Sequence, residues 1–138
     1  MGKLLGIDYG GRRIGLATAA EDTSLAFPLQ TIQYDEITEA IQQIKDVCVQ
    51  ENVLKIIMGL PKDQHGGIGE KAREVEMFSK KLTKAIEIPI EYEDERFTSV
   101  MAAQHMKQKG KKEHEFRTSL DQEAATIILQ SYLDRIHG

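Results

Sequence analysis

Apolar and polar positions alternate along the first third of the chain, in three short runs that predict β-strands. The runs cover Lys3–Asp8, Arg12–Ala20 and Leu25–Gln33, with a glycine-containing break after the first and the turn Glu21–Ser24 after the second. Such short turns join antiparallel neighbours, so we expect an antiparallel meander. Pro28 lacks a backbone N–H, which favours an edge position for the third strand.

The period changes after Asp35, where apolar residues recur every three or four positions. This spacing predicts an amphipathic helix whose apolar face holds Ile37, Ile41, Ile44, Val47 and Cys48. The short apolar run Leu54–Met58 then predicts a buried strand. A loop over Gln64–Gly69 leads into a second helix, with Ala72, Val75, Phe78, Leu82 and Ile86 on one face.

The alternation of strand and helix continues to the end of the chain. Pro89 ends the second helix, Ile90–Asp94 predicts a fifth strand, and two helices follow, over Thr98 to about Lys109 and Ser119 to about Ile136. A meander followed by such crossovers predicts one α/β domain over residues 1–138. Its mixed five-stranded sheet has later strands parallel to the first and helices on its faces.

Composition limits the classes of protein to consider. The chain has 138 residues, a net charge of −4 and one cysteine, Cys48, which excludes an internal disulfide and suits a reducing compartment. No apolar run is long enough for a membrane span or a secretory signal, so we expect a cytoplasmic protein. Lys107–Lys112 holds four lysines, while most acids lie elsewhere. A basic surface for nucleic acid is therefore compatible with the acidic total.

Carboxylates at the ends of several elements are the residues to examine for chemistry. Phosphodiester hydrolysis by two divalent cations needs such carboxylates to converge, one bridging both ions and the others holding each from the side. Asp8 ends the first strand and precedes Tyr9, Gly10 and Gly11, where an open backbone would let a phosphate approach. The same pattern is typical of an aspartate that starts a turn, and the residues do not choose between these interpretations.

Two further acids could join Asp8. The fifth strand ends in an acidic run in which Glu91, Glu93 and Glu95 share one face; a solvated acidic edge is the plain alternative, and position alone does not choose between Asp94 and Glu95. Asp121 is expected in the first turn of the last helix, where the helix dipole alone favours an acid. Small side chains follow it, Ala124 and Ala125, and would let that helix lie close to the sheet.

The remaining candidates are weaker. The glycine-rich segment from Gly66 to Gly69 could contact phosphate, but it lacks the ending of a P-loop, and a plain connector explains it as well. The four histidines show no zinc-ligand spacing. Cys48 lies on the apolar face of its helix, as a core residue would.

An ordered set of segments resembles the YqgF/RuvX family of the RNase H-like superfamily. The segments are Gly6-Ile7-Asp8-Tyr9-Gly10 with Arg13-Ile14-Gly15-Leu16-Ala17, then Gly59-Leu60-Pro61, then Asp94-Glu95-Arg96-Phe97-Thr98-Ser99, and finally Asp121 with Ala124-Ala125 and Ile128-Leu129-Gln130. The resemblance implies an RNase H-like fold and a nuclease whose catalytic, metal-binding carboxylates are Asp8, Glu95 and Asp121. It implies Mg²⁺ or Mn²⁺ as cofactor, as two ions. Gly59-Leu60-Pro61 carries no acid where resolvases of RuvC type place one, so Glu95 would have to substitute.

The resemblance also implies a nucleic-acid partner, with phosphates contacted by basic side chains. The candidates are Arg12, Arg13, Lys62, Lys71, Arg96, Lys111, Lys112 and Arg117. The favoured function is maturation of the 5′ end of pre-16S rRNA, and the main alternative is resolution of DNA junctions, which favours a homodimer over a monomer. A non-catalytic RNA- or ribosome-binding module is a third hypothesis. A fourth is a nucleotide-binding ATPase, because Asp8-Tyr9-Gly10 also resembles a phosphate loop of actin-like and sugar-kinase proteins; those duplicate the domain, and this chain has one copy.

Overall fold

A mixed five-stranded sheet forms the centre of the protein. The computed structural model describes residues 2–61, 69–95 and 113–137, with the side chains of 113–119 left out. The strands lie in the order β3-β2-β1-β4-β5, and their bounds are β1 Lys3–Tyr9, β2 Arg13–Ala20, β3 Phe27–Gln33, β4 Val53–Leu60 and β5 Ile90–Asp94. β1, β2 and β3 pair antiparallel, whereas β4 and β5 run parallel to β1. The predicted meander and mixed sheet are confirmed.

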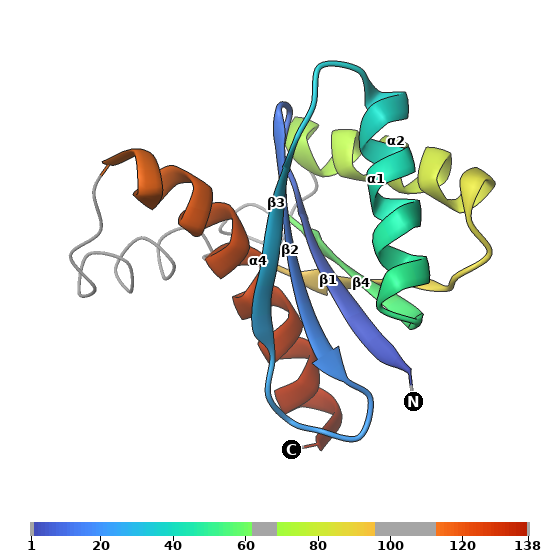
Figure 1. Ribbon diagram of the computed structural model, residues 1–138, viewed down its shortest axis with the longest axis vertical. Coiled ribbons are helices and arrows are strands. Elements are labelled where there is room, and N and C mark those ends of the chain that lie inside the picture. Colours follow the sequence, from blue (N-terminus) through green and yellow to red (C-terminus); the bar gives the residue numbers. More distant parts are fainter. Residues whose placement is uncertain (1, 62–68, 96–112, 138) are drawn as a thin grey trace.

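Helices cover both faces of this sheet (Figure 1). α1 (Ile37–Gln50) and α2 (Glu70–Ala85) pack on one face, and α4 (Glu113–His137) packs on the other. Two separate apolar clusters result, because the strands are buried from both sides. Cys48 is buried in the cluster beneath α1 and α2, as expected.

Successive side chains of β1 face opposite sides of the sheet. Leu5 and Ile7 belong to the cluster under α1 and α2, while Leu4 belongs to the cluster under α4. Since successive side chains point to opposite faces, Gly6 and Asp8 share the α4 face with Leu4. The tip of the strand is held from the other side, where Tyr9 stacks on Phe78 of α2 with ring centroids 4.4 Å apart.

The last helix differs from the expectation. It begins at Glu113 rather than near Ser119, because no glycine or proline interrupts the chain between these positions. The prediction that Asp121 lies in the first turn is therefore wrong: it lies in the interior of α4, where a helix dipole does not explain it. The other expected helix, from Thr98 to Lys109, lies outside the described residues.

The third strand also starts later than expected, at Phe27 instead of Leu25. The backbone N–H of Ala26 donates to the side-chain oxygen of Gln130 on α4 at 3.0 Å, so the ladder begins after it. β3 is an edge strand, as predicted from Pro28, and the register with β2 shifts beside that proline. No helix within the described ranges is long and apolar enough to cross a bilayer.

Candidate active site

Two carboxyl groups meet where neighbouring strands end, on the face covered by α4. Asp8 lies near the end of β1, and Glu95 follows β5 directly. The N–H of Glu95 donates to the carbonyl oxygen of Leu60 at 3.2 Å, which extends the pairing of β4 and β5 by one residue. Because β1, β4 and β5 are parallel, their carboxyl ends lie at the same edge of the sheet, and this edge carries the pair.

The Asp8 and Glu95 carboxyl groups are close enough to share a hydrogen bond. Burial raises the pKa of Asp8 to about 6, against its ordinary value of 3.8. Burial, and then the charge of Asp8, raise the pKa of Glu95 to about 9. A half-buried and a buried carboxyl group that share a hydrogen bond cannot both ionise without large repulsion, so the pair retains a proton at neutral pH.

The surroundings of Glu95 leave part of its carboxyl group without a partner. Its Oε1 atom is buried and accepts no hydrogen bond from any residue that the structure describes. Gly59 of β4 lies against the other side of the group: a Cβ added there would sit 3.0 Å from Cδ and Oε2 of Glu95. A glycine at this position therefore makes room for the Glu95 carboxyl group.

Asp121 approaches Asp8 from α4. Gly15 of β2 pairs with Asp8, and the main chain of Asp121 lies directly on Gly15, where an added Cβ would overlap its carbonyl oxygen. The negative charge of Asp121 contributes to the raised pKa of Asp8. Its carboxylate is nevertheless bound to Arg13, whose Nε donates to Oδ2 at 2.6 Å.

The structure thus brings two of the three predicted acids together and places the third nearby, in an ion pair. Among the side chains that the structure describes, no group of three or more His, Cys, Asp or Glu is close enough to hold one metal ion. The assignment of Asp8, Glu95 and Asp121 as one catalytic set stays a prediction. In this arrangement Arg13 engages one carboxylate oxygen of Asp121, Oδ2.

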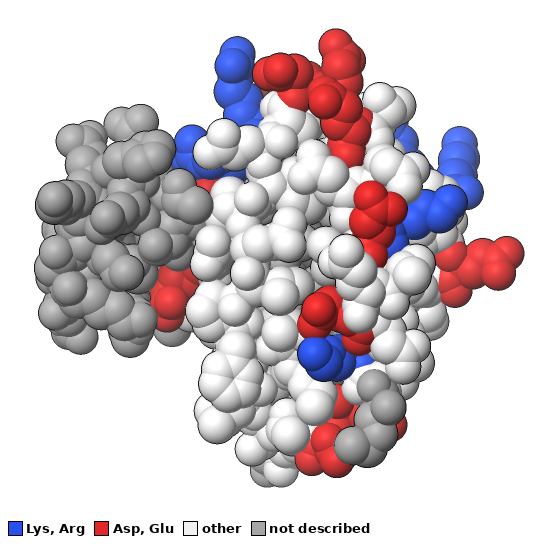
Figure 2. All heavy atoms as spheres, in the orientation of Figure 1, with Lys and Arg blue, Asp and Glu red and all other residues white. Residues whose placement is uncertain are grey.

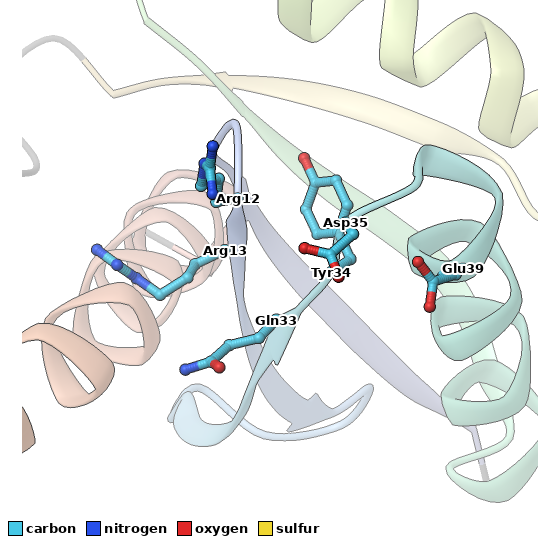
Figure 3. Close-up of a pocket in the computed structure, with 6 residues that line it drawn as sticks. All are labelled: Arg12, Arg13, Gln33, Tyr34, Asp35 and Glu39. Atoms are coloured by element: carbon cyan, nitrogen blue, oxygen red, sulfur yellow. The ribbon is translucent and has the colours of Figure 1, made fainter.

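Basic side chains flank the acids on two sides. Lys71, in the first turn of α2, lowers the pKa of both Asp8 and Glu95 by its charge, although burial outweighs it. Arg12 and Arg13 line a surface depression of about 360 Å³ at the start of β2 (Figure 3). Its other walls are Gln33, Tyr34, Asp35 and Glu39. Of the predicted phosphate-binding residues, Lys71 therefore acts on Asp8 and Glu95 by its charge, Arg13 contacts Asp121, and Arg12 joins Arg13 at the depression.

The other predicted contacts cannot be placed. Lys62, Arg96, Lys111 and Lys112 lie outside the described residues, as does the segment from Gly66 to Ile68. Arg117 belongs to α4, but its side chain is not described. In Figure 2, charged side chains of both signs gather at the end of the molecule that holds the β1–β2 turn and the start of α1. The middle of that face carries few charges.

Sequence reasoning missed the residues that hold the acids in place. Glu93 is buried and accepts hydrogen bonds from Ser131 Oγ at 2.9 Å and from Arg135 Nη2 at 2.8 Å, which joins β5 to α4. The alternative of a solvated acidic edge is therefore wrong for Glu93 and Glu95, which are both buried. The period-two spacing of the acids was the available signal, since it puts both on the α4 face.

Comparisons with known proteins agree with this geometry. A family model described as "RuvX: Holliday junction resolvase" matches residues 2–135. The chain is 40% identical over 131 residues to a protein of Crocosphaera subtropica named "Putative pre-16S rRNA nuclease", covering 95% of this chain and 92% of that one. A protein of the same name from Bacteroides fragilis is 38% identical over 137 residues, or 97% of each chain.

The fold is also similar to a solved structure, T. thermophilus RuvC in complex with a Holliday junction substrate. The TM-score is 0.58 at 12% identity, and the match covers 99% of this chain and 97% of that one. At this identity the likeness shows a common fold, which confirms the predicted RNase H-like architecture.

Proposed function

The chain belongs to the RuvX family of nucleases, and from that premise we propose that its Asp8–Glu95 site hydrolyses phosphodiester bonds near the 5′ end of pre-16S rRNA. The observation that carries the proposal is the pairing of the half-buried Asp8 and the buried Glu95 carboxyl groups at the ends of β1 and β5. A reaction on pre-rRNA would take place in the cytoplasm.

The residues of the site fit divalent cations. Two adjacent carboxyl groups, with a buried oxygen of Glu95 that accepts no hydrogen bond from the described residues, are hard oxygen ligands of the kind that Mg²⁺ and Mn²⁺ prefer. Asp8 and Glu95 would hold the ions, and Asp121 would join them from α4. Two such ions, when bound, activate water and neutralise charge on the attacking and leaving oxygens of the phosphate.

The chain's own residues would orient the substrate and the acids. Binding a cation requires the shared proton of Asp8 and Glu95 to leave, so the raised pKa values couple activity to pH. Lys71 adds positive charge beside the pair, where it favours the ionised carboxylates and would attract a phosphate. Arg12 and Arg13 would contact phosphates along the nucleic-acid backbone.

Pre-rRNA is favoured as the substrate because relatives of that name match nearly the whole chain at 38–40% identity. Resolution of a DNA four-way junction is the second candidate, favoured by the description of the family model. Symmetric cleavage of two strands needs two copies of the site, so a junction resolvase would act as a homodimer, whereas a pre-rRNA nuclease can act as a monomer.

The test is cleavage of a pre-rRNA fragment and a four-way junction of matched length, with Mg²⁺, Mn²⁺ or a chelator. We expect cleavage of the RNA at its 5′ side, which is lost with the chelator and in Asp8→Asn. Preferential cleavage of the junction by a dimer would instead support the second candidate. Cleavage that survives both the chelator and Asp8→Asn would contradict the proposed mechanism.

A matched control variant shows whether the loss of cleavage in Asp8→Asn is specific to the site. Asp22→Asn changes the same residue type in the exposed turn after β2, away from the sheet end that carries the pair, and should leave cleavage unchanged.

If Asp8→Asn fully restores cells that lack the protein, the non-catalytic RNA- or ribosome-binding module becomes the better hypothesis.

A further inference from the structure

Arg13 connects the acids of the site to the surface depression beside them. Its Nε donates to Asp121 Oδ2 at 2.6 Å, a short, charge-assisted hydrogen bond. The Arg13 side chain is 40% exposed and the Asp121 side chain 19%, so the pair is partly open to solvent. The third predicted acid is thus neutralised by a residue that an incoming ligand can reach.

Arg13 is one of two cationic side chains at the depression, whose acidic residues are Asp35 and Glu39. It lines the same depression as Arg12, and in Figure 3 its side chain extends away from Asp35 and Glu39, toward α4. A guanidinium has five N–H donors in a planar fork that matches phosphate oxygens. A backbone phosphate between the two arginines would therefore compete with Asp121 for Arg13.

Close packing of α4 on β2 fixes the main chain of Asp121. The backbone of Asp121 lies against Gly15, which pairs with Asp8 in the sheet, so Asp121 stays beside Asp8 in either arrangement. With Arg13 in place, the described acids form no group of three around a common point.

We propose that Arg13 is a substrate-operated latch on Asp121. In the free protein it holds Asp121 away from a cation at Asp8 and Glu95, and a nucleic-acid phosphate bound at the depression takes Arg13 and releases Asp121. Arg13 is in this sense a positioning residue, and the inference rests on the proposed function. Because linkage is reciprocal, the nucleic acid raises the affinity for the cation and the cation raises the affinity for the nucleic acid.

The first test measures Mn²⁺ binding to the free protein by the loss of the free-ion EPR signal, so it does not depend on cleavage. Arg13→Gln keeps a polar side chain but breaks the ion pair, and it should bind Mn²⁺ about three- to tenfold more tightly than wild type. Arg12→Gln removes the same charge from the same depression and is the matched control. We expect it to change the affinity less than twofold, roughly the screened effect of a more distant exposed charge.

A double-mutant cycle isolates the pair. Asp121→Asn removes the carboxylate that Arg13 binds, so adding Arg13→Gln to this variant should leave its Mn²⁺ affinity unchanged. A phosphorothioate oligoribonucleotide of the pre-rRNA 5′ region should increase the Mn²⁺ affinity of wild type by a larger factor than that of Arg13→Gln. The Mn²⁺ bound by the oligonucleotide alone is subtracted.

Two results would overturn the latch. One is equal Mn²⁺ affinity in Arg13→Gln and Arg12→Gln; the other is an effect of Arg13→Gln that persists beside Asp121→Asn. Either leaves the proposed function intact if Asp8→Asn still lowers the Mn²⁺ affinity of the protein. If Asp8→Asn binds Mn²⁺ as wild type does, the metal site itself is wrong and both proposals fail.

Discussion

The main chain of Asp121 rests on Gly15, with no room between them for a side chain on β2. Two similar approaches follow along the same helix. At Gly6 an added Cβ would lie 2.9 Å from the carbonyl oxygen of Ala125, and at Gly59 it would overlap the side chain of Ile128. α4 therefore packs directly against glycines of three adjacent strands, and this packing sets the distance of Asp121 from the sheet.

The first prediction concerns Gly15→Ala. The added methyl group would meet backbone atoms of α4, which cannot rotate away, so we expect a loss of about 3 kcal/mol in the free energy of unfolding. Gly11→Ala is the control, because a Cβ at Gly11 has no atom within 4 Å. Urea unfolding of both variants measures the difference. Equal stability of the two would show that α4 is not held this closely.

The sheet was predictable from the sequence, because each strand has its own local pattern of apolar and polar residues. Alternation in residues 3–33 and the apolar run around Ile56 predict strands from local pattern alone, and the short turns leave few ways to order them. Ala124 and Ala125 predicted a close approach of the last helix, and both are buried. The packing of that helix on the strand glycines was not predictable, since a glycine in a strand does not reveal which element covers it.

The candidate site was predictable only in part, because it depends on distances between distant segments. The family resemblance singled out Asp8 and Glu95, and their carboxyl groups lie together, while their catalytic role stays a prediction. The ion pair of Arg13 with Asp121 joins residues 108 positions apart and has no local signature. The last helix was expected from near Ser119, whereas α4 begins at Glu113, because no glycine or proline interrupts residues 113–119.

The second prediction is a fall in stability with rising pH when a chelator is present. Folding raises the pKa of Asp8 from 3.8 to about 6 and that of Glu95 from 4.5 to about 9. The unfolded chain therefore releases these protons first, and stability falls from about pH 4 until the pH passes the folded values. We expect a loss of several kcal/mol in the free energy of unfolding between pH 5 and pH 9, measured as urea midpoints.

Asp8→Asn supplies the control for this effect. It removes one carboxyl and the repulsion acting on Glu95, so its stability should fall less over the same range. Saturating Mg²⁺ should also flatten the wild-type curve, because a cation binds the ionised pair. A constant difference between wild type and Asp8→Asn at every pH would mean that the two carboxyls share no proton in the folded protein.

The third prediction compares Glu93 with Glu91, two acids on the same face of β5. Glu93 is buried and bound by Ser131 and Arg135, whereas Glu91 is half exposed and its Oε2 lies 3.9 Å from Arg135 Nη2. Glu93→Ala should lower the free energy of unfolding by about 2 kcal/mol, since it removes charge-assisted hydrogen bonds between β5 and α4. Glu91→Ala should change it by less than about 0.5 kcal/mol.

The same pair of variants tests how the site is held. Glu93 is two residues before Glu95 on the same strand face, so loosening β5 should misplace the Glu95 carboxyl relative to Asp8. We expect Glu93→Ala to lower kcat about tenfold or more at temperatures where it remains folded, with Glu91→Ala close to wild type. Circular dichroism under the assay conditions confirms folding. Full activity in folded Glu93→Ala would show that Glu95 is positioned by β4 alone, through Leu60 and Gly59.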